Sequence, residues 1–105
     1  VLGPVVMAGR GGIFTEVFGE VAFRRAPVSV AGARAMLAEL RGYVLLTGAR
    51  GQAPADIDAL AEAISRLSVF ASAHADVLES VEMNPVRALP DGVMALDALI
   101  VKRTD

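Results

Sequence analysis

The sequence predicts an α+β fold in which an antiparallel sheet is covered by two helices. Short runs of β-branched and aromatic residues, bounded by Gly and Pro, occur near both ends of the chain and are typical of strands. Two segments between them carry apolar residues at the spacing of an amphipathic helix. The predicted order is therefore βββααββ, and short turns between neighbouring strands favour antiparallel pairing.

Three short strands are expected near the N-terminus, at 4–8, 13–18 and 21–26. Pro27 ends the third strand, because proline has no N–H to donate to a ladder. Arg24 and Arg25 are neighbours on that strand and face opposite ways, so only one of them can point toward a site. Either arginine could hold a phosphate; the simpler expectation is that one is solvated and the other pairs with a carboxylate.

The first two strands are separated by Gly9-Arg10-Gly11-Gly12. A glycine-rich hairpin turn is the simpler interpretation of this run. The alternative is an anion-binding nest, in which consecutive backbone N–H groups and a guanidinium meet a phosphate. The run leads into a strand and lacks the Walker pattern, so it matches neither the P-loop nor the dinucleotide fingerprint.

Two helices are expected in the middle of the chain. Ser29 is a suitable N-cap for the first, which continues to about Leu40 before Gly42 stops it. Residues 43–53 are expected to form a loop. The second helix is expected to begin near Pro54 and to end near His74. The apolar stripes of the two helices are Val30, Ala33, Met36, Leu37 and Leu40, then Ile57, Leu60, Ala61, Ile64, Leu67 and Phe70 or Ala71.

The last two strands are expected to form a hairpin. Leu89-Pro90-Asp91-Gly92 suits a type I turn. If Leu89 lies opposite Gly92, the numbers of paired residues sum to 181. Asn84 then falls directly across from Asp97, and Glu82 lies diagonal to Asp97 on the same face.

Asp97 interrupts an apolar run over residues 93–101. Both faces of that strand are apolar, so the carboxylate has no obvious solvated side, and burying it unpaired would cost several kcal/mol. Convergence of Glu82, Asn84 and Asp97 would offer the oxygen ligands that Mg²⁺ favours. The alternative is an edge strand with a wet face, in which Asp97 pairs with Arg24, Arg25 or Arg87.

The composition bounds the class of protein. The chain has 105 residues, 54% of them hydrophobic, a formal net charge of −2 and no cysteine. We expect a single subdomain excised from a longer chain, with no membrane span and no nucleic-acid partner. The lack of cysteine suits a reducing compartment, here the cytoplasm.

Several runs taken together resemble the ATP-grasp part of ADP-forming acetyl-CoA (acyl-CoA) synthetases. The succinyl-CoA synthetase β subunit is a more distant relative, in which a Glu-x-Asn-Pro run precedes a Leu-Asp pair. The order and spacing of the runs carry the resemblance, which covers nearly the whole chain. The main runs are 3–7, 11–14, 16–17, 21–24, 82–85 and 96–97.

The resemblance implies one half of an ATP-grasp fold, the C-terminal one. It implies that Asn84 and Asp97 hold the magnesium that bridges nucleotide phosphates. Glu82 is implied to lie near the phosphoryl-transfer centre and the phosphohistidine intermediate. Gly11, Gly12 and Arg24 match family positions and are candidates for binding the cofactor, ATP or ADP. Ala8 and Arg10 depart from the family, which has a large apolar and an uncharged residue there.

The implied function is part of a nucleotide-dependent acyl-CoA ligase that reversibly converts acyl-CoA, ADP and phosphate to acid, CoA and ATP. The isolated chain is expected to be inactive, because the other nucleotide subdomain, the phosphorylated histidine and the CoA-binding domains or subunit lie outside it. One alternative is a degenerate, non-catalytic ATP-grasp domain with a regulatory or scaffold role, for example fused to a protein acetyltransferase. Another is a small interaction domain that forms homo-oligomers through an exposed apolar edge.

Overall fold

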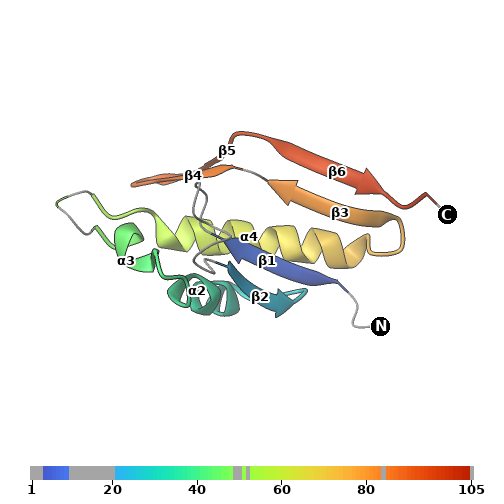
Figure 1. Cartoon of the computed structure of the whole chain (residues 1–105), viewed down its shortest axis with the longest axis horizontal. Coiled ribbons are helices and arrows are strands. Elements are labelled where there is room, and N and C mark those ends of the chain that lie inside the picture. The colour runs from blue at the N-terminus through green and yellow to red at the C-terminus, as the bar shows by residue number, and fades with distance from the viewer. Residues whose placement is uncertain (1–3, 10–20, 49–50, 52, 84, 105) are drawn as a thin grey trace.

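The computed structural model describes residues 4–9, 21–48, 51, 53–83 and 85–104. It confirms the α+β class with antiparallel strands. The expected strand 13–18 lies outside the described residues. The elements (Figure 1) are β1 (Val5–Gly9), β2 (Val21–Arg25), α2 (Val30–Ala38), α3 (Tyr43–Leu46), α4 (Ile57–Ala73), β3 (Leu78–Met83), β4 (Val86–Leu89), β5 (Gly92–Ala95) and β6 (Ala98–Lys102).

The described strands form three two-stranded ladders, β1–β2, β3–β6 and β4–β5, where a single sheet is expected from the sequence. The hairpin is divided because both of its arms leave strand geometry at the same level, at Pro85 and at Leu96–Asp97. Pro85 cannot donate a ladder hydrogen bond. Its carbonyl instead accepts the N–H of Leu96 at 2.9 Å, which keeps the arms together across the break.

α2 begins where the sequence predicts. The Oγ of Ser29 accepts the N–H of Gly32 at 3.0 Å and so satisfies one of the free donors of the first turn. Ala33, Met36 and Leu37 form the buried face of the helix. The helix ends at Ala38, two residues earlier than expected.

Two expectations for the middle of the chain are corrected. Tyr43–Leu46, expected to be loop, forms the short helix α3. α4 begins at Ile57 and not near Pro54, because Asp56 is the N-cap and its Oδ1 accepts the N–H of Ala59 at 3.0 Å. The end of α4, with His74 as the C-cap, agrees with the prediction.

The hydrophobic core lies where α2 and α4 pack against the inner face of the β1–β2 ladder. Among the described residues, none of the buried apolar residues of this core comes from the hairpin (β3 to β6). The partly buried Ile57, Leu60 and Ile64 of α4 pack against this core. Its buried members are Val6, Ala22, Val28, Ala33, Met36, Leu37, Leu40 and Ala61.

A buried serine on α4 attaches the start of α2 to this core. Ser68 is 1% exposed, and its Oγ accepts the N–H of Val28 at 2.9 Å. Ser65 donates its hydroxyl to the carbonyl of Val28 at 2.7 Å. The predicted apolar stripe of this helix did not include Ser65 and Ser68, although both satisfy backbone groups of Val28 inside the fold.

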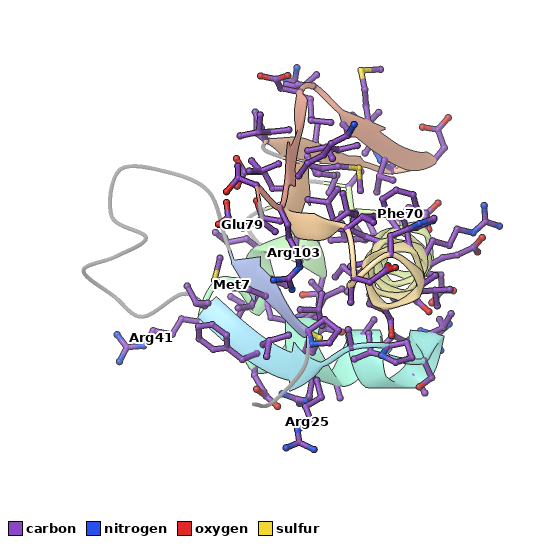
Figure 2. The ribbon with its side chains drawn as sticks, turned by 90° about the vertical axis from the view of Figure 1, so that its right-hand side faces the viewer. Met7, Arg25, Arg41, Phe70, Glu79 and Arg103 are labelled. Atoms are coloured by element: carbon purple, nitrogen blue, oxygen red, sulfur yellow. The ribbon has the colours of Figure 1, made fainter. Side chains whose placement is uncertain are left out.

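The hairpin crosses α4 on the side away from α2, while β1 and β2 cover a neighbouring side (Figures 1 and 2). It is attached at both ends. Near its tip, the N–H of Asp56 donates to the carbonyl of Leu89 at 2.7 Å. At the other end, Arg103 donates through Nε to the carbonyl of Ala75 at 2.9 Å. None of the helices in the described residues is long and apolar enough to cross a membrane.

Candidate functional site

The register of the hairpin is the one predicted from its turn. In the β4–β5 ladder Leu89 lies opposite Gly92. In the β3–β6 ladder Glu82 lies opposite Leu99. Both pairs sum to 181, so the register continues across the break that contains Asp97. Asn84 falls outside the residues that the structure describes, and its place opposite Asp97 stays a prediction.

Asp97 lies between β5 and β6 and is exposed, so the expectation of a carboxylate without a solvated side is wrong. Its Oδ1 accepts the N–H of Ala98 at 2.8 Å. The nearby apolar side chains are exposed as well: Leu96 and Leu99 are each 54% exposed. The uncovered face of the hairpin therefore leaves this carboxylate in contact with solvent and available to a ligand.

Glu82 and Asp97 line one open pocket of about 230 Å³, together with Ala98 and Leu99. The predicted register placed Glu82, Asn84 and Asp97 on one face of the hairpin. Two of these three residues, Glu82 and Asp97, line the same pocket in the structure. The lining thus combines two acidic residues with the apolar Leu99, which is the cross-strand neighbour of Glu82. Such an open surface can hold a cation that keeps part of its hydration shell.

The alternative in which an arginine neutralises Asp97 has no support in the described residues. None of Arg24, Arg25 and Arg87 forms an ion pair with Asp97 there. Figure 2 shows Arg25 pointing away from the body of the molecule. Within the described residues, therefore, no guanidinium forms an ion pair with the carboxylate of Asp97.

Arg24 is paired elsewhere. It lies opposite Val6 in the β1–β2 ladder and forms an ion pair with Glu39, just beyond the end of α2. One hydrogen bond of this pair, donated by Nη1 of Arg24 to Oε1 of Glu39, measures 3.2 Å. The hydrogen bond raises the pKa of Arg24 above its usual value and lowers that of Glu39.

Arg24 is not among the residues that line the Glu82–Asp97 pocket. A role for Arg24 in binding nucleotide remains a prediction. Gly11 and Gly12, the other cofactor-binding candidates, lie outside the described residues, as does Arg10.

The described residues contain no group of three or more His, Cys, Asp or Glu side chains arranged to hold a metal ion. Glu82 and Asp97 alone do not complete a coordination shell. Mg²⁺ in proteins, however, is usually bound by one or two carboxylates together with waters and substrate phosphates. A carboxylate pair beside an open pocket fits that kind of partial site, and the amide of Asn84 is the predicted additional donor.

The backbone also contributes to this site, which the sequence did not predict. The N–H of Ala98 holds one oxygen of Asp97, and this local bond occurs where the chain re-enters a strand. Asp commonly bonds to nearby backbone N–H groups at such places. The available signal was an Asp in the midst of strand-forming residues, which favours a local interruption over a continuous strand.

The comparisons with known proteins agree with this architecture. The sequence profile of an ATP-grasp domain family matches residues 1–101. The acetate–CoA ligase [ADP-forming] I of Archaeoglobus fulgidus is 40% identical over 94% of this chain, which spans 14% of that protein. The β subunit of acetate–CoA ligase [ADP-forming] I of Pyrococcus furiosus is 39% identical over 94% of the chain, which spans 42% of it.

A solved structure of the dinucleotide-forming acetyl-coenzyme A synthetase 1 of Ca. Korarchaeum cryptofilum, in complex with coenzyme A and Mg-AMPPCP, matches with a TM-score of 0.88. It is 41% identical, and the match covers 97% of this chain and 47% of that one. The chain thus spans less than half the length of each of these relatives. With its profile match, its fold and its hairpin site, this chain belongs to the ATP-grasp domain family, and its relatives are ADP-forming CoA ligases.

Proposed function

We propose that this chain is the C-terminal ATP-grasp subdomain of an ADP-forming acyl-CoA ligase and supplies the magnesium–phosphate side of its active site. The reaction is acyl-CoA + ADP + phosphate ⇌ acid + CoA + ATP. One observation supports the proposal most directly: Glu82 and Asp97 line a common pocket of the hairpin. The relatives, all longer than the chain, are enzymes of this class.

In this proposal Asp97 and Asn84 would hold Mg²⁺, which supplies charge neutralisation for the transferring phosphoryl group. Asp97 is suited to this because the N–H of Ala98 fixes one of its oxygens, and no donor among the described residues occupies the other. Glu82, opposite Leu99 in the ladder, would orient the imidazole that carries the phosphoryl group by accepting its N–H.

The proposal also requires parts that this chain does not contain. The relatives continue well beyond the matched region, and one solved relative carries coenzyme A and Mg-AMPPCP. We infer that a second nucleotide-binding subdomain and CoA-binding domains complete the site, in the same chain or in another subunit. On its own, the chain would then bind a cation and phosphates weakly and turn over no substrate. A cytoplasmic location fits an enzyme of this class that has no cysteine in this segment.

The test is Asp97→Asn in the complete enzyme, with ATP formation from acetyl-CoA, ADP and phosphate as the readout. We expect turnover to fall by at least about 100-fold, since an interaction with developing charge is typically worth that much. Asp91→Asn, the same chemical change at the hairpin tip, is the control and should leave turnover unchanged. Activity close to that of the unmodified enzyme would overturn the assignment of Asp97.

The non-catalytic alternative makes a different prediction for the unmodified protein. A degenerate domain would bind Mg-ATP, as measured by calorimetry, without forming ATP from acyl-CoA and phosphate or releasing phosphate. The exposed position of Asp97 and the openness of its pocket are compatible with such a binding role. Turnover in the same preparation would exclude it.

A further inference from the structure

The β1–β2 ladder is apolar on both of its faces. Val6 and Ala22 are buried on the inner face, against the helices. The outer face carries Val5 and the cross-strand pair of Met7 and Phe23, which are 62% and 58% exposed. An antiparallel ladder with one solvated face alternates apolar and polar side chains, whereas strands covered on both faces are apolar nearly throughout. The sequence of this ladder is therefore typical of strands that are covered from both sides.

The exposed sides of the two long helices differ from this outer face, because they carry ion pairs. Arg34 of α2 pairs with Asp58 of α4 at 2.7 Å, and Arg66 pairs with Glu62 along α4 at 2.6 Å. Charged side chains opposite the apolar face of a helix are typical of a surface that stays in water. The apolar face that calls for a covering partner is thus the outer face of the ladder.

Arg25 lies at the margin of this outer face. It is opposite Val5 in the ladder, is exposed, and forms no ion pair within the described residues. Protein interfaces commonly combine an apolar centre that contains aromatic residues and Met with a polar rim, and Arg is enriched in them. The outer face fits a protein surface with an apolar centre and an acidic group at its margin.

The outer face also lies toward the hairpin strand that carries the candidate site. Figure 2 shows Met7 of β1 and Glu79 of β3 extending to the same side of the molecule, away from α4. β3 also contains Glu82 of the candidate pocket. A body that covers the ladder would therefore stand on the side of the molecule to which β3 extends Glu79.

We propose that the outer face of the β1–β2 ladder, formed by Val5, Met7, Phe23 and Arg25, docks against the remaining part of the same subunit. This inference rests on the proposed function, which assigns the chain to a longer enzyme. The chain spans 42% of the β subunit from Pyrococcus furiosus, so more than half of a subunit of that length lies outside it. A tethered partner acts at an effective concentration of roughly millimolar, which favours it over a second copy of the chain.

The experiment measures the oxidation of Met7 by hydrogen peroxide in the complete protein, by mass spectrometry, with the urea-unfolded protein as the reference. In the folded protein, Met7 should be oxidised at least about tenfold more slowly than in urea, as should the buried Met36. The protection should persist without nucleotide and without any second subunit. It should also persist after about 100-fold dilution, because a contact within one subunit does not depend on protein concentration.

Phe23→Glu tests the face directly. Phe23 and Val44 of α3 are almost equally exposed in this chain, 58% and 57%, so glutamate at either position would reach water if nothing covered the ladder. In the complete protein, Phe23→Glu should restore most of the reactivity of Met7, whereas the matched control Val44→Glu should leave Met7 protected. Met36 should stay protected in both variants, which shows that they are folded. Equal reactivity of Met7 in the two folded variants would overturn the proposal.

The unmodified protein decides the matter even where a variant does not fold. Oxidation of Met7 as fast as in urea would overturn the proposed interface. Protection that is lost on dilution would indicate a second copy, and protection that requires Mg-ATP would indicate a nucleotide; either result would also overturn it. ATP formation and its dependence on Asp97 test the proposed function separately. An active enzyme in which Met7 reacts freely would keep that function and lose this interface.

Discussion

Glu82 and Asp97 line the same pocket, although Glu82 belongs to β3 and Asp97 lies in the break between β5 and β6. Their meeting depends on one register, which is maintained on both sides of the break at Pro85. The hydrogen bond from Leu96 to the Pro85 carbonyl joins the two arms at that level. The candidate site is thus a property of the whole hairpin, and changes that shift its register should separate Glu82 from Asp97.

The hairpin tip depends on Gly92, whose φ of +136° is strongly unfavourable for a residue with a side chain. A Cβ at this position would meet nothing within 4 Å, so the penalty comes from the backbone alone. Gly92→Val should lower the free energy of unfolding by about 1–3 kcal/mol, measured by urea denaturation. The matched change Ala88→Val in the same ladder should have a smaller effect. Equal stability of the Gly92 variant and the unmodified chain would show that the turn is not held in this conformation.

The buried serine on α4 should contribute measurably to stability. Ser68→Ala leaves the N–H of Val28 without its acceptor inside the protein, which should cost about 1–3 kcal/mol. Ser65→Ala should cost less, because the Val28 carbonyl still faces the Ser68 hydroxyl. Ser72→Ala, on the same helix, is the control. The free energy of unfolding is measured by thermal or urea denaturation. An equal loss of stability in Ser68→Ala and Ser72→Ala would contradict the role of this contact.

The start of α4 carries two separable contacts at Asp56. Asp56→Ala removes the side-chain cap to Ala59 but keeps the backbone N–H that bonds Leu89. The expected loss of stability is about 1 kcal/mol, and Asp56→Asn should recover most of it, since Asn is an equally good N-cap. Hydrogen exchange of the Asp56 amide should stay protected in both variants. Loss of that protection in Asp56→Ala would mean that cap and hairpin contact are coupled.

The Arg24–Glu39 pair should be visible in the acid titration of Glu39. Arg24 lowers the pKa of this carboxyl, so the folded state is favoured above the unfolded pKa and loses that contribution as the pH falls through the lowered folded pKa. Arg24→Gln should return the pKa of Glu39 toward its usual value, as measured by NMR. High salt should produce part of the same change, because the pair is exposed. An unchanged titration curve would show that the pair does not persist in solution.

The local chemistry of the chain was sufficient to predict much of this structure. Ser29 could be identified as a helix cap, and Pro90-Asp91-Gly92 as a turn, because both depend on neighbouring residues only. The position of this turn also fixed the register of the hairpin, because the residues that close a hairpin determine which residues pair along its strands. The resemblance in motif order identified the family, which the profile match confirms.

Other features required the packed molecule. The exposure of Asp97 could not be read from its apolar neighbours, because only the fold shows that the core forms between α2, α4 and the β1–β2 ladder and leaves the hairpin uncovered. The burial of Ser68 could not be predicted from local sequence, because its partner Val28 lies 40 residues away in the chain. The pairing of Arg24 with Glu39 likewise joins segments by long-range packing, which local sequence patterns do not encode.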